Sequence, residues 1–218
     1  MNGQIKVPMV PEAFYKLSEL PLIQKKLDAI SQKYGTLIRE ASRLTNVPLE
    51  LILSFAFIES GGDAMAVSKA GAVGIMQLQP QSATDMIHLE YSKERLSDEE
   101  KSVLRQTLKT RLDCIFKMKF MSHKLPCNNN TGAVVTKSDL FNPAFNILVG
   151  SIYLGILLDQ HTEKGVVRLD KIVYRYNRGY FSKPKDYPIE NIIASTNEET
   201  RGYILKLAGK NGLLDLIT

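Results

Sequence analysis

The sequence lacks the cysteine and histidine patterns that mark disulfide scaffolds and metal sites. Its two cysteines, Cys114 and Cys127, could pair, but so few give no disulfide framework, and we expect two unpaired thiols. His123 lies between them, yet no second group of cysteine or histidine has ligand spacing, so we expect no metal and no other cofactor. Nothing in the composition indicates disorder or a collagen-like repeat.

Long apolar runs and long runs of one charge are also missing. The stretch 145–158 is shorter than the roughly 20 residues that cross a bilayer, and 49–58 contains Glu50, so both are expected to be buried helices. Residues 1–11 lack the charged start and the apolar segment of a secretory signal. No run of five or more Lys and Arg occurs, which argues against a nucleic-acid-binding arm.

What the chain does have is the composition of a folded domain. Its 218 residues, 44% apolar and 23% charged, are enough for one domain with a core and an additional segment. The net charge of +5 favours polyanions such as nucleic acid, an anionic membrane surface or the acidic cell wall, but does not choose among them.

Hydrophobic periodicity predicts helices in the first sixty residues. In the N-terminal segment 1–44, apolar residues recur at three- and four-residue intervals, and Pro21 and Gly35 divide them into two helices. A further helix begins near Pro48, because proline loses no hydrogen bond in a first turn. It ends at the glycine pair that starts at Gly61, since glycine readily adopts the conformation that terminates a helix.

The rest of the chain is predicted to be mainly helical with one small β element. The glycine-rich stretch 71–78 favours a short strand or hairpin. The charged stretch 90–125 is expected to form solvated surface helices, and 125–139 a loop. A helix that is apolar nearly all round, and therefore central, begins after Asn142. Further ordered segments are expected over 172–180 and 197–206.

Glu59 is the acidic residue whose surroundings point to chemistry. It ends an apolar helix, after Phe55 and Ile58 and before the glycine pair. Loss of hydration beside aromatic side chains should raise the pKa of this carboxyl. A carboxylic acid kept protonated near neutral pH is what protonation of a glycosidic oxygen requires. From this position alone, a structural glutamate that caps a helix end or pairs with a lysine is the alternative.

Four blocks of residues occur in one order along the chain. The first holds Glu59-Ser60, Ser68, Gly71-Ala72, Gly74, Ile75-Met76-Gln77, Pro80 and Ala83; the second Asn142-Pro143, Asn146-Ile147, Gly150 and Tyr153-Leu154; the third Tyr176-Asn177 and Gly179; the last Glu199-Thr200-Arg201 and Tyr203-Ile204. Together they resemble the catalytic domain of the soluble lytic transglycosylases, a branch of the lysozyme-like superfamily related to goose-type lysozymes. The resemblance covers residues 45–208 approximately. It implies a mainly α, α+β lysozyme-like fold: a helical bundle around a buried central helix, with a small β element beside the active-site cleft.

The resemblance also implies a role for each site residue. Glu59 is the single catalytic acid/base, and the hydroxyl of Tyr176 stands near it across the cleft. Substrate-binding residues are implied at Ser68, Met76, Gln77, Tyr176, Asn177 and Glu199. Core packing is the alternative role of Met76, since methionine fills gaps between side chains.

The implied reaction cleaves peptidoglycan at the β-1,4 bond between N-acetylmuramic acid and N-acetylglucosamine. Glu59 protonates the bridging oxygen, the 2-acetamido oxygen of the substrate supports an oxocarbenium-like state, and ionised Glu59 takes the C6 hydroxyl proton. That hydroxyl closes a 1,6-anhydro ring without water. A second carboxylate would instead give hydrolysis by a muramidase. Asp63 and Asp85 are the candidates, although both are expected to lie at the surface.

Two features depart from the family pattern. Arg178 stands in the Tyr-Asn-x-Gly block where a small residue is common, and it could narrow the cleft or contact a carboxylate of the peptide stem. Residues 84–141 form a charged insertion, which could be a lid, a docking surface or inert decoration. We therefore expect an N-terminal helical segment, 1–44, and a catalytic domain, 45–218, that carries this insertion.

The alternative of another class is a catalytically inert, cell-wall-binding part of a virion or secretion machine. The intact Glu59, Gln77 and Tyr176 argue against it. The expected partners are peptidoglycan strands and, if the chain serves such a machine, that assembly; neither nucleic acid nor a membrane span is expected. Action in the periplasm or cell wall without a visible signal suggests a phage particle or a specialised export route. The sequence does not give endo or exo cleavage, or the oligomeric state.

Overall fold

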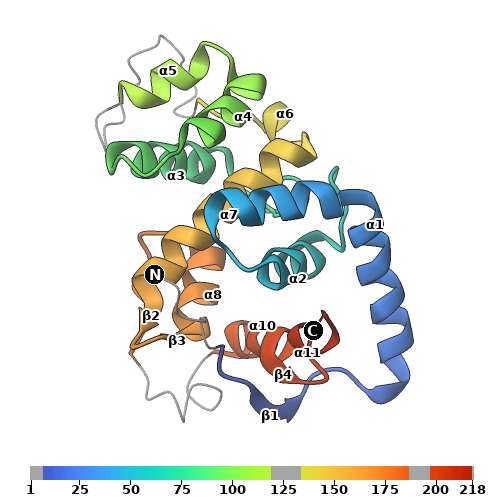
Figure 1. Cartoon of the computed structure of the whole chain (residues 1–218). Coiled ribbons are helices and arrows are strands. Elements are labelled where there is room, and N and C mark those ends of the chain that lie inside the picture. The colour runs from blue at the N-terminus through green and yellow to red at the C-terminus, as the bar shows by residue number, and fades with distance from the viewer. Residues whose placement is uncertain (1–6, 119–133, 187–196, 218) are drawn as a thin grey trace. The chain divides into compact units, whose positions relative to one another are not determined.

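The computed structural model describes residues 7–118, 134–186 and 197–217 (Figure 1). The chain falls into two compact units. Ile30–Tyr153 form one, which we call the middle unit; Met1–Ala29 with Leu154–Thr218 form the other, the terminal unit. Two long helices, α1 (Leu20–Thr45) and α7 (Pro143–His161), contribute residues to both. The predicted boundary at residue 44 stays a prediction.

The regular structure of both units is mainly helical. Besides parts of α1 and α7, the middle unit holds α2 (Leu49–Ser60), α3 (Pro80–Ser92), α4 (Asp98–Leu108), α5 (Arg111–Phe116) and α6 (Lys137–Leu140). The terminal unit holds the 3-10 turn η1 (Leu17–Glu19), α8 (Leu169–Arg178), α10 (Glu198–Ala208) and α11 (Leu213–Ile217). It also has two small sheets: β1 (Val10–Ala13) parallel to β4 (Gly209–Lys210), and β2 (Thr162–Glu163) antiparallel to β3 (Val166–Val167). The predicted fold class is confirmed.

Helix α1 is continuous, so the prediction of two helices in this segment is wrong. Pro21 occupies its first turn, where a missing N–H breaks no intrahelical hydrogen bond. Gly35 costs a helix interior only about 1 kcal/mol relative to alanine. In the middle unit this cost is offset by burial of apolar side chains along α1, at Ile30, Tyr34, Ile38 and Ala41.

Helix α2 forms where the sequence predicted it, and it carries Glu59 at its end. Pro48 precedes its first turn, and all residues of the stretch 51–56 are buried, so this part of α2 is enclosed on every side. Gly61 ends the helix with φ at 63°, a left-handed conformation that glycine adopts without steric cost. The Gly61 N–H donates to the carbonyl oxygen of Phe57 at 2.9 Å. The predicted termination at the glycine pair is confirmed.

The insertion at 84–141 has an apolar core of its own. Helix α4 begins at Ser97, whose hydroxyl accepts a hydrogen bond from the Glu100 N–H while the Glu100 carboxylate accepts one from the Ser97 N–H. Helix α5 contacts both α3 and α4 (Figure 1). Four side chains from α4 and α5 have no exposed surface: Leu104, Leu108, Leu112 and Ile115. The expectation of solvated helices therefore holds only for their outer faces.

Cys114 in α5 is disulfide-bonded, so the expectation of two unpaired thiols is wrong. The one other cysteine, Cys127, lies outside the described residues, as do His123 and much of the predicted loop 125–139. The last part of that predicted loop is the short helix α6. It forms because Thr136 and Asp139 exchange side-chain-to-backbone hydrogen bonds at its start, at 2.8 and 3.3 Å.

Helix α7 is a buried core helix, as the sequence predicted. Among the described residues it is the one helix long and apolar enough to cross a membrane, but 72% of that stretch is buried within the fold. Several of its side chains in the middle unit are almost completely enclosed: Phe145, Ile147, Leu148 and Val149. Such burial is typical of the core helix of a folded domain.

Candidate active site

The residues predicted to act on substrate lie in two groups, one in each unit. Glu59, Ser68, Met76 and Gln77 belong to the middle unit, and Tyr176, Asn177 and Glu199 belong to the terminal unit. Each group is held by contacts inside its own unit. The predicted approach of the Tyr176 hydroxyl to Glu59 stays a prediction.

Glu59 is the penultimate residue of α2 and is half-buried. The stretch 51–56 before it is buried and Gly61 after it is exposed. The carboxyl therefore stands at the edge of an apolar core, partly withdrawn from water and still open to a ligand. Because the six residues 51–56 of this 12-residue helix are buried, the backbone that carries Glu59 is held firmly.

Ser60 ties the end of α2 to the loop that follows. Its hydroxyl donates to the carbonyl oxygen of Ile75 at 2.8 Å, and also lies 3.2 Å from that of Ala56 one turn back. The same hydroxyl accepts a hydrogen bond from the Gly62 N–H at 3.1 Å. The residue next to Glu59 thus fixes the distance between the helix end and the 66–78 loop.

The predicted hairpin at 71–78 is present as isolated β-bridges. Val73 pairs with Leu78 through two backbone hydrogen bonds of 2.9 and 3.0 Å, and it also bridges to Val67. Ser68 closes the turn that joins Val67 to Val73, because its hydroxyl accepts a hydrogen bond from the Ala72 N–H at 3.0 Å. The Ser68 side chain therefore shapes the loop, and its contact with a sugar stays a prediction.

Gln77 has a strained backbone and a bracing side chain. Its φ is 46°, in the left-handed region that residues other than glycine seldom adopt. The side-chain amide nitrogen donates to the carbonyl oxygens of Gly74 at 2.9 Å and Ala66 at 3.2 Å. These bonds hold a conformation that costs about 1 kcal/mol or more. Backbone strain of this kind is concentrated at functional sites. Contact between Gln77 and a sugar stays a prediction.

Asn146 of α7 is a positioning residue to which sequence reasoning assigned no role. Its side chain is completely buried. The Oδ1 atom accepts from the Met76 N–H at 2.8 Å, and Nδ2 donates to the carbonyl oxygens of Val73 and Leu140, both at 2.9 Å. Gly74 leaves room for this amide, since a Cβ there would overlap Asn146 Nδ2. The presence of Asn146 in the second block was the signal available in the sequence.

Met76 is fully buried and packs against α7. A Cβ at Gly150 would lie 2.8 Å from both Cβ and Cγ of Met76, so the helix and the loop approach each other as closely as glycine allows. Core packing, the alternative that the sequence left open, accounts for this position. Contact between Met76 and a sugar stays a prediction.

The two candidates for a second catalytic carboxylate are both engaged in local structure. Asp63 is exposed, and its Oδ1 accepts from the Met65 N–H at 2.8 Å in a turn of its own. Asp85 is half-buried, and its Oδ1 accepts from the Gln81 side chain one helical turn earlier at 2.8 Å. Within the described ranges, no group of three or more Cys, His, Asp or Glu side chains is placed to hold a metal ion.

In the terminal unit, a buried ion pair anchors the start of α8. The guanidinium of Arg168 donates to both carboxylate oxygens of Asp170, at 3.0 and 2.8 Å, and the two side chains are 5% and 3% exposed. The other end of α8 carries Tyr176, which is buried, and Asn177, which is exposed. No pattern in the sequence indicated this anchor, because both residues look like ordinary surface charges.

Glu199 lies on the first turn of α10 and pairs with the last residue of α8. Nη2 of Arg178 donates to Oε2 of Glu199 at 3.2 Å, and both side chains are more than half exposed. Arg178 is the residue that departs from the family pattern. The structure thus brings the third and fourth blocks together, and Arg178 forms the bridge.

Comparison with known proteins supports the same family. Residues 36–105 match the family model of the transglycosylase SLT domain, a stretch that lies entirely in the middle unit and contains Glu59. The chain is also similar to proteins named membrane-bound lytic murein transglycosylase C. In Glaesserella parasuis the identity is 23% over 144 residues, 66% of this chain and 29% of the relative.

Two further relatives of the same name extend the comparison. In Mannheimia succiniciproducens the identity is 28% over 142 residues, 65% of this chain and 29% of the relative. In Histophilus somni it is 24% over 210 residues, 86% of this chain and 47% of the relative. The chain therefore spans less than half the length of these relatives. The 36–105 stretch of the chain is therefore similar to the transglycosylase SLT domain, and the chain resembles lytic murein transglycosylases at low identity.

Proposed function

We propose that this chain is a peptidoglycan lytic transglycosylase and that Glu59 is its single acid/base. The position of Glu59 carries the proposal: it is half-buried at the end of an apolar helix and lies inside the stretch that matches the SLT domain. The loop that follows is held by Ser60 and Asn146. The names of the relatives support this activity, since each is a lytic murein transglycosylase.

The proposed reaction uses Glu59 twice. As an acid it protonates the oxygen between N-acetylmuramic acid and N-acetylglucosamine, and the C–O bond breaks with oxocarbenium-like charge on the anomeric carbon. The 2-acetamido oxygen of the substrate supports that charge. As a carboxylate, Glu59 then removes the proton of the C6 hydroxyl, whose oxygen bonds to the anomeric carbon and closes the 1,6-anhydro ring. Atoms balance without water.

The local engagement of Asp63 and Asp85 favours ring closure over hydrolysis. A hydrolytic enzyme that inverts the anomeric centre needs a second carboxylate free to activate water. Asp63 instead accepts a backbone hydrogen bond in its own turn, and Asp85 accepts one from Gln81. A muramidase on the same fold is therefore the less supported outcome.

The remaining predicted residues complete the proposed substrate site. We propose that the exposed Asn177 and Glu199 contact the glycan, and that Tyr176 acts beside Glu59. For Ser68, Met76 and Gln77, support comes from their place in the loop after Glu59, where they shape the backbone that a sugar would meet. The proposed place of action is the cell wall; association with a virion or a secretion machine remains a prediction.

The test is a product analysis on purified glycan strands, with one matched control. Glu59→Gln keeps the size of the side chain and removes the proton donor, so the cleavage rate should fall about 10²–10⁴-fold. Glu50→Gln makes the same change in the first turn of the same helix, at another half-buried carboxyl, and should leave the rate unchanged. Mass spectrometry identifies the products.

The product masses separate the candidate functions. Anhydro ends make each product lighter by about 18 mass units, one water, than its hydrolytic counterpart. Reducing ends in place of anhydro ends would contradict ring closure and leave a muramidase. Unchanged cleavage by Glu59→Gln would show that another residue is the acid. Binding to strands without any cleavage by the unaltered chain would indicate the inert wall-binding alternative.

A further inference from the structure

The end of α8 and the segment after it are rich in basic residues. Residues 171–185 contain five Lys or Arg and no Asp or Glu. Lys171 is engaged in ion pairs with Glu163 and Asp186. Arg178 is the most exposed arginine that α8 itself presents. This segment attracts anions to the neighbourhood of Asn177 and Glu199.

Arg178 keeps most of its hydrogen-bonding capacity for a ligand. Its side chain is 57% exposed, and its ion pair with Glu199 is a single N–O contact of 3.2 Å. Arg168, by contrast, is 5% exposed and binds Asp170 through two nitrogen atoms. A guanidinium binds a carboxylate best through two parallel hydrogen bonds. A second carboxylate can therefore replace Glu199 and bind Arg178 more completely.

Open space and an exposed aromatic ring lie next to Arg178. Among the described residues, a Cβ built on Gly179 would meet no atom within 4 Å, so the space at that position, beside the end of α8, is open. Phe181 is 52% exposed, and its ring meets that of Tyr180 edge to face at 5.0 Å. Tyr180 is held in turn, since its hydroxyl accepts a hydrogen bond from Gln160. An anionic ligand with an apolar portion fits this combination.

We propose that Arg178 is a specificity-determining residue that binds a carboxylate of the peptide stem on the glycan strand, releasing Glu199 in exchange. The inference rests on the proposed function and deepens it. Among the parts of peptidoglycan, the stem peptide joins several carboxylates to apolar side chains. Phe181 contacts the apolar side chains, and the guanidinium takes the carboxylate in bidentate form.

The test compares two substrates that differ only in charge: glycan strands with native stems, and the same strands with stem carboxylates converted to amides. Arg178→Gln should raise KM for native strands about tenfold, since one charge-assisted interaction is lost, and leave kcat unchanged. On amidated strands the variant and the unaltered chain should have equal KM. Arg201→Gln is the matched control, because it breaks another exposed arginine pair, with Glu12 at 2.8 Å, in the same unit.

A binding measurement keeps this inference separate from the proposed reaction. In the Glu59→Gln background, adding Arg178→Gln should weaken binding of native strands about tenfold, by the same loss. Another outcome is that the unaltered chain cleaves neither substrate while this difference in binding appears. In that case the proposed reaction is wrong and the role of Arg178 stands. An equal KM for the unaltered chain and Arg178→Gln on native strands would overturn the role of Arg178. An equal rise in the KM of Arg178→Gln on native and amidated strands would also overturn it.

Discussion

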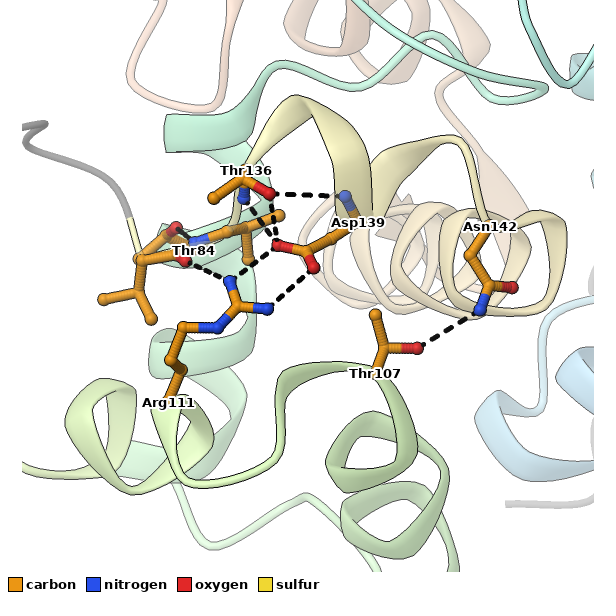
Figure 2. Close-up of polar contacts among 8 residues, drawn as sticks. Thr84, Thr107, Arg111, Thr136, Asp139 and Asn142 are labelled. Atoms are coloured by element: carbon orange, nitrogen blue, oxygen red, sulfur yellow. Dashed lines mark hydrogen bonds and ion pairs between the residues drawn. The ribbon is translucent and has the colours of Figure 1, made fainter.

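Arg111 and Asp139 are joined at both ends of the guanidinium: Nη1 donates to Oδ2 and Nη2 to Oδ1, each at 2.7 Å. Figure 2 shows that Thr136 completes the arrangement, with its N–H and its hydroxyl donating to the same carboxylate at 2.8 and 2.7 Å. Arg111 also donates to the carbonyl oxygen of Val134. Burial alone would raise the pKa of Asp139, but these donors keep it below its usual value. The pair joins α5 to the last part of the 84–141 insertion.

Breaking this pair should destabilise the middle unit. Asp139→Asn leaves Arg111 facing a neutral partner, and we expect a loss of about 2–3 kcal/mol in the free energy of unfolding. Urea denaturation measures the change. The control is Asp113→Asn, which disrupts the exposed Arg105–Asp113 pair, 48% and 45% exposed, and should cost at most about 1 kcal/mol. Equal losses in the two variants would contradict a structural role for the Arg111–Asp139 pair.

Asn146→Asp should destabilise the folded protein far more than the small difference in side-chain size suggests. The substitution replaces a donor with an acceptor against the carbonyl oxygens of Val73 and Leu140. We expect a loss of about 3 kcal/mol or more, because two buried carbonyls lose their partner and meet a negative charge. Asn142→Asp, at the residue just before the same helix, should be nearly neutral, since either residue caps the N–H of Ala144. Thermal unfolding of both variants gives the comparison.

Ser60→Ala should reduce cleavage more than it reduces stability. It removes the 2.8 Å bond to Ile75 that fixes the 66–78 loop beside Glu59. The hydroxyl also accepts from the Gly62 N–H, so the stability loss should be about 1–2 kcal/mol, the usual value of two neutral hydrogen bonds. Ser42→Ala removes a similar hydroxyl-to-carbonyl bond, to Val47 at 2.7 Å, and should cost about 1 kcal/mol without changing kcat. If both variants kept full kcat, the loop position would not depend on Ser60.

The terminal unit should become less stable as the pH decreases, because of His161. Burial, together with the nearby cations Arg175 and Lys171, lowers the pKa of His161 from 6.5 to about 4, although Asp170 and Glu163 act in the opposite direction. Between about 6.5 and 4 the unfolded chain binds a proton that the folded chain does not, so stability decreases as pH falls through this window. The total loss is on the order of 3 kcal/mol. Below this window both states are protonated and the loss stops growing.

His161→Leu removes the titrating group and tests this assignment. Urea denaturation at pH 7, 6 and 5 should show the decline in the unaltered chain and a smaller decline in the variant. Among the described residues, the buried ring nitrogen Nε2 has no hydrogen-bond partner, so its loss leaves no donor or acceptor there unsatisfied. A decline of the same size in both would assign it to other groups.

The sequence predicted those features that depend on neighbouring residues. The end of α2 follows from Gly61, and the buried helix α7 follows from its unbroken apolar composition. Gly35 shows where local rules fail, because packing of α1 in the middle unit outweighs a weak helix former. The brace from Asn146 to Met76 joins residues far apart in sequence, and no local pattern encodes such a hydrogen bond. The Arg111–Asp139 ion pair could not be predicted from the sequence for the same reason, since its residues are 28 positions apart.

The close approach of Met76 to Gly150 has a practical consequence for altering substrate range. At Gly150 a side chain would collide with Met76, and at Gly74 with the amide of Asn146, so both positions accept little beyond a hydrogen atom. Random variation of the 71–78 loop would therefore yield mostly unfolded chains. Libraries built on Arg178 and Phe181, which are exposed, leave these contacts intact. A new specificity should be easier to select at the end of α8 than beside the proposed acid.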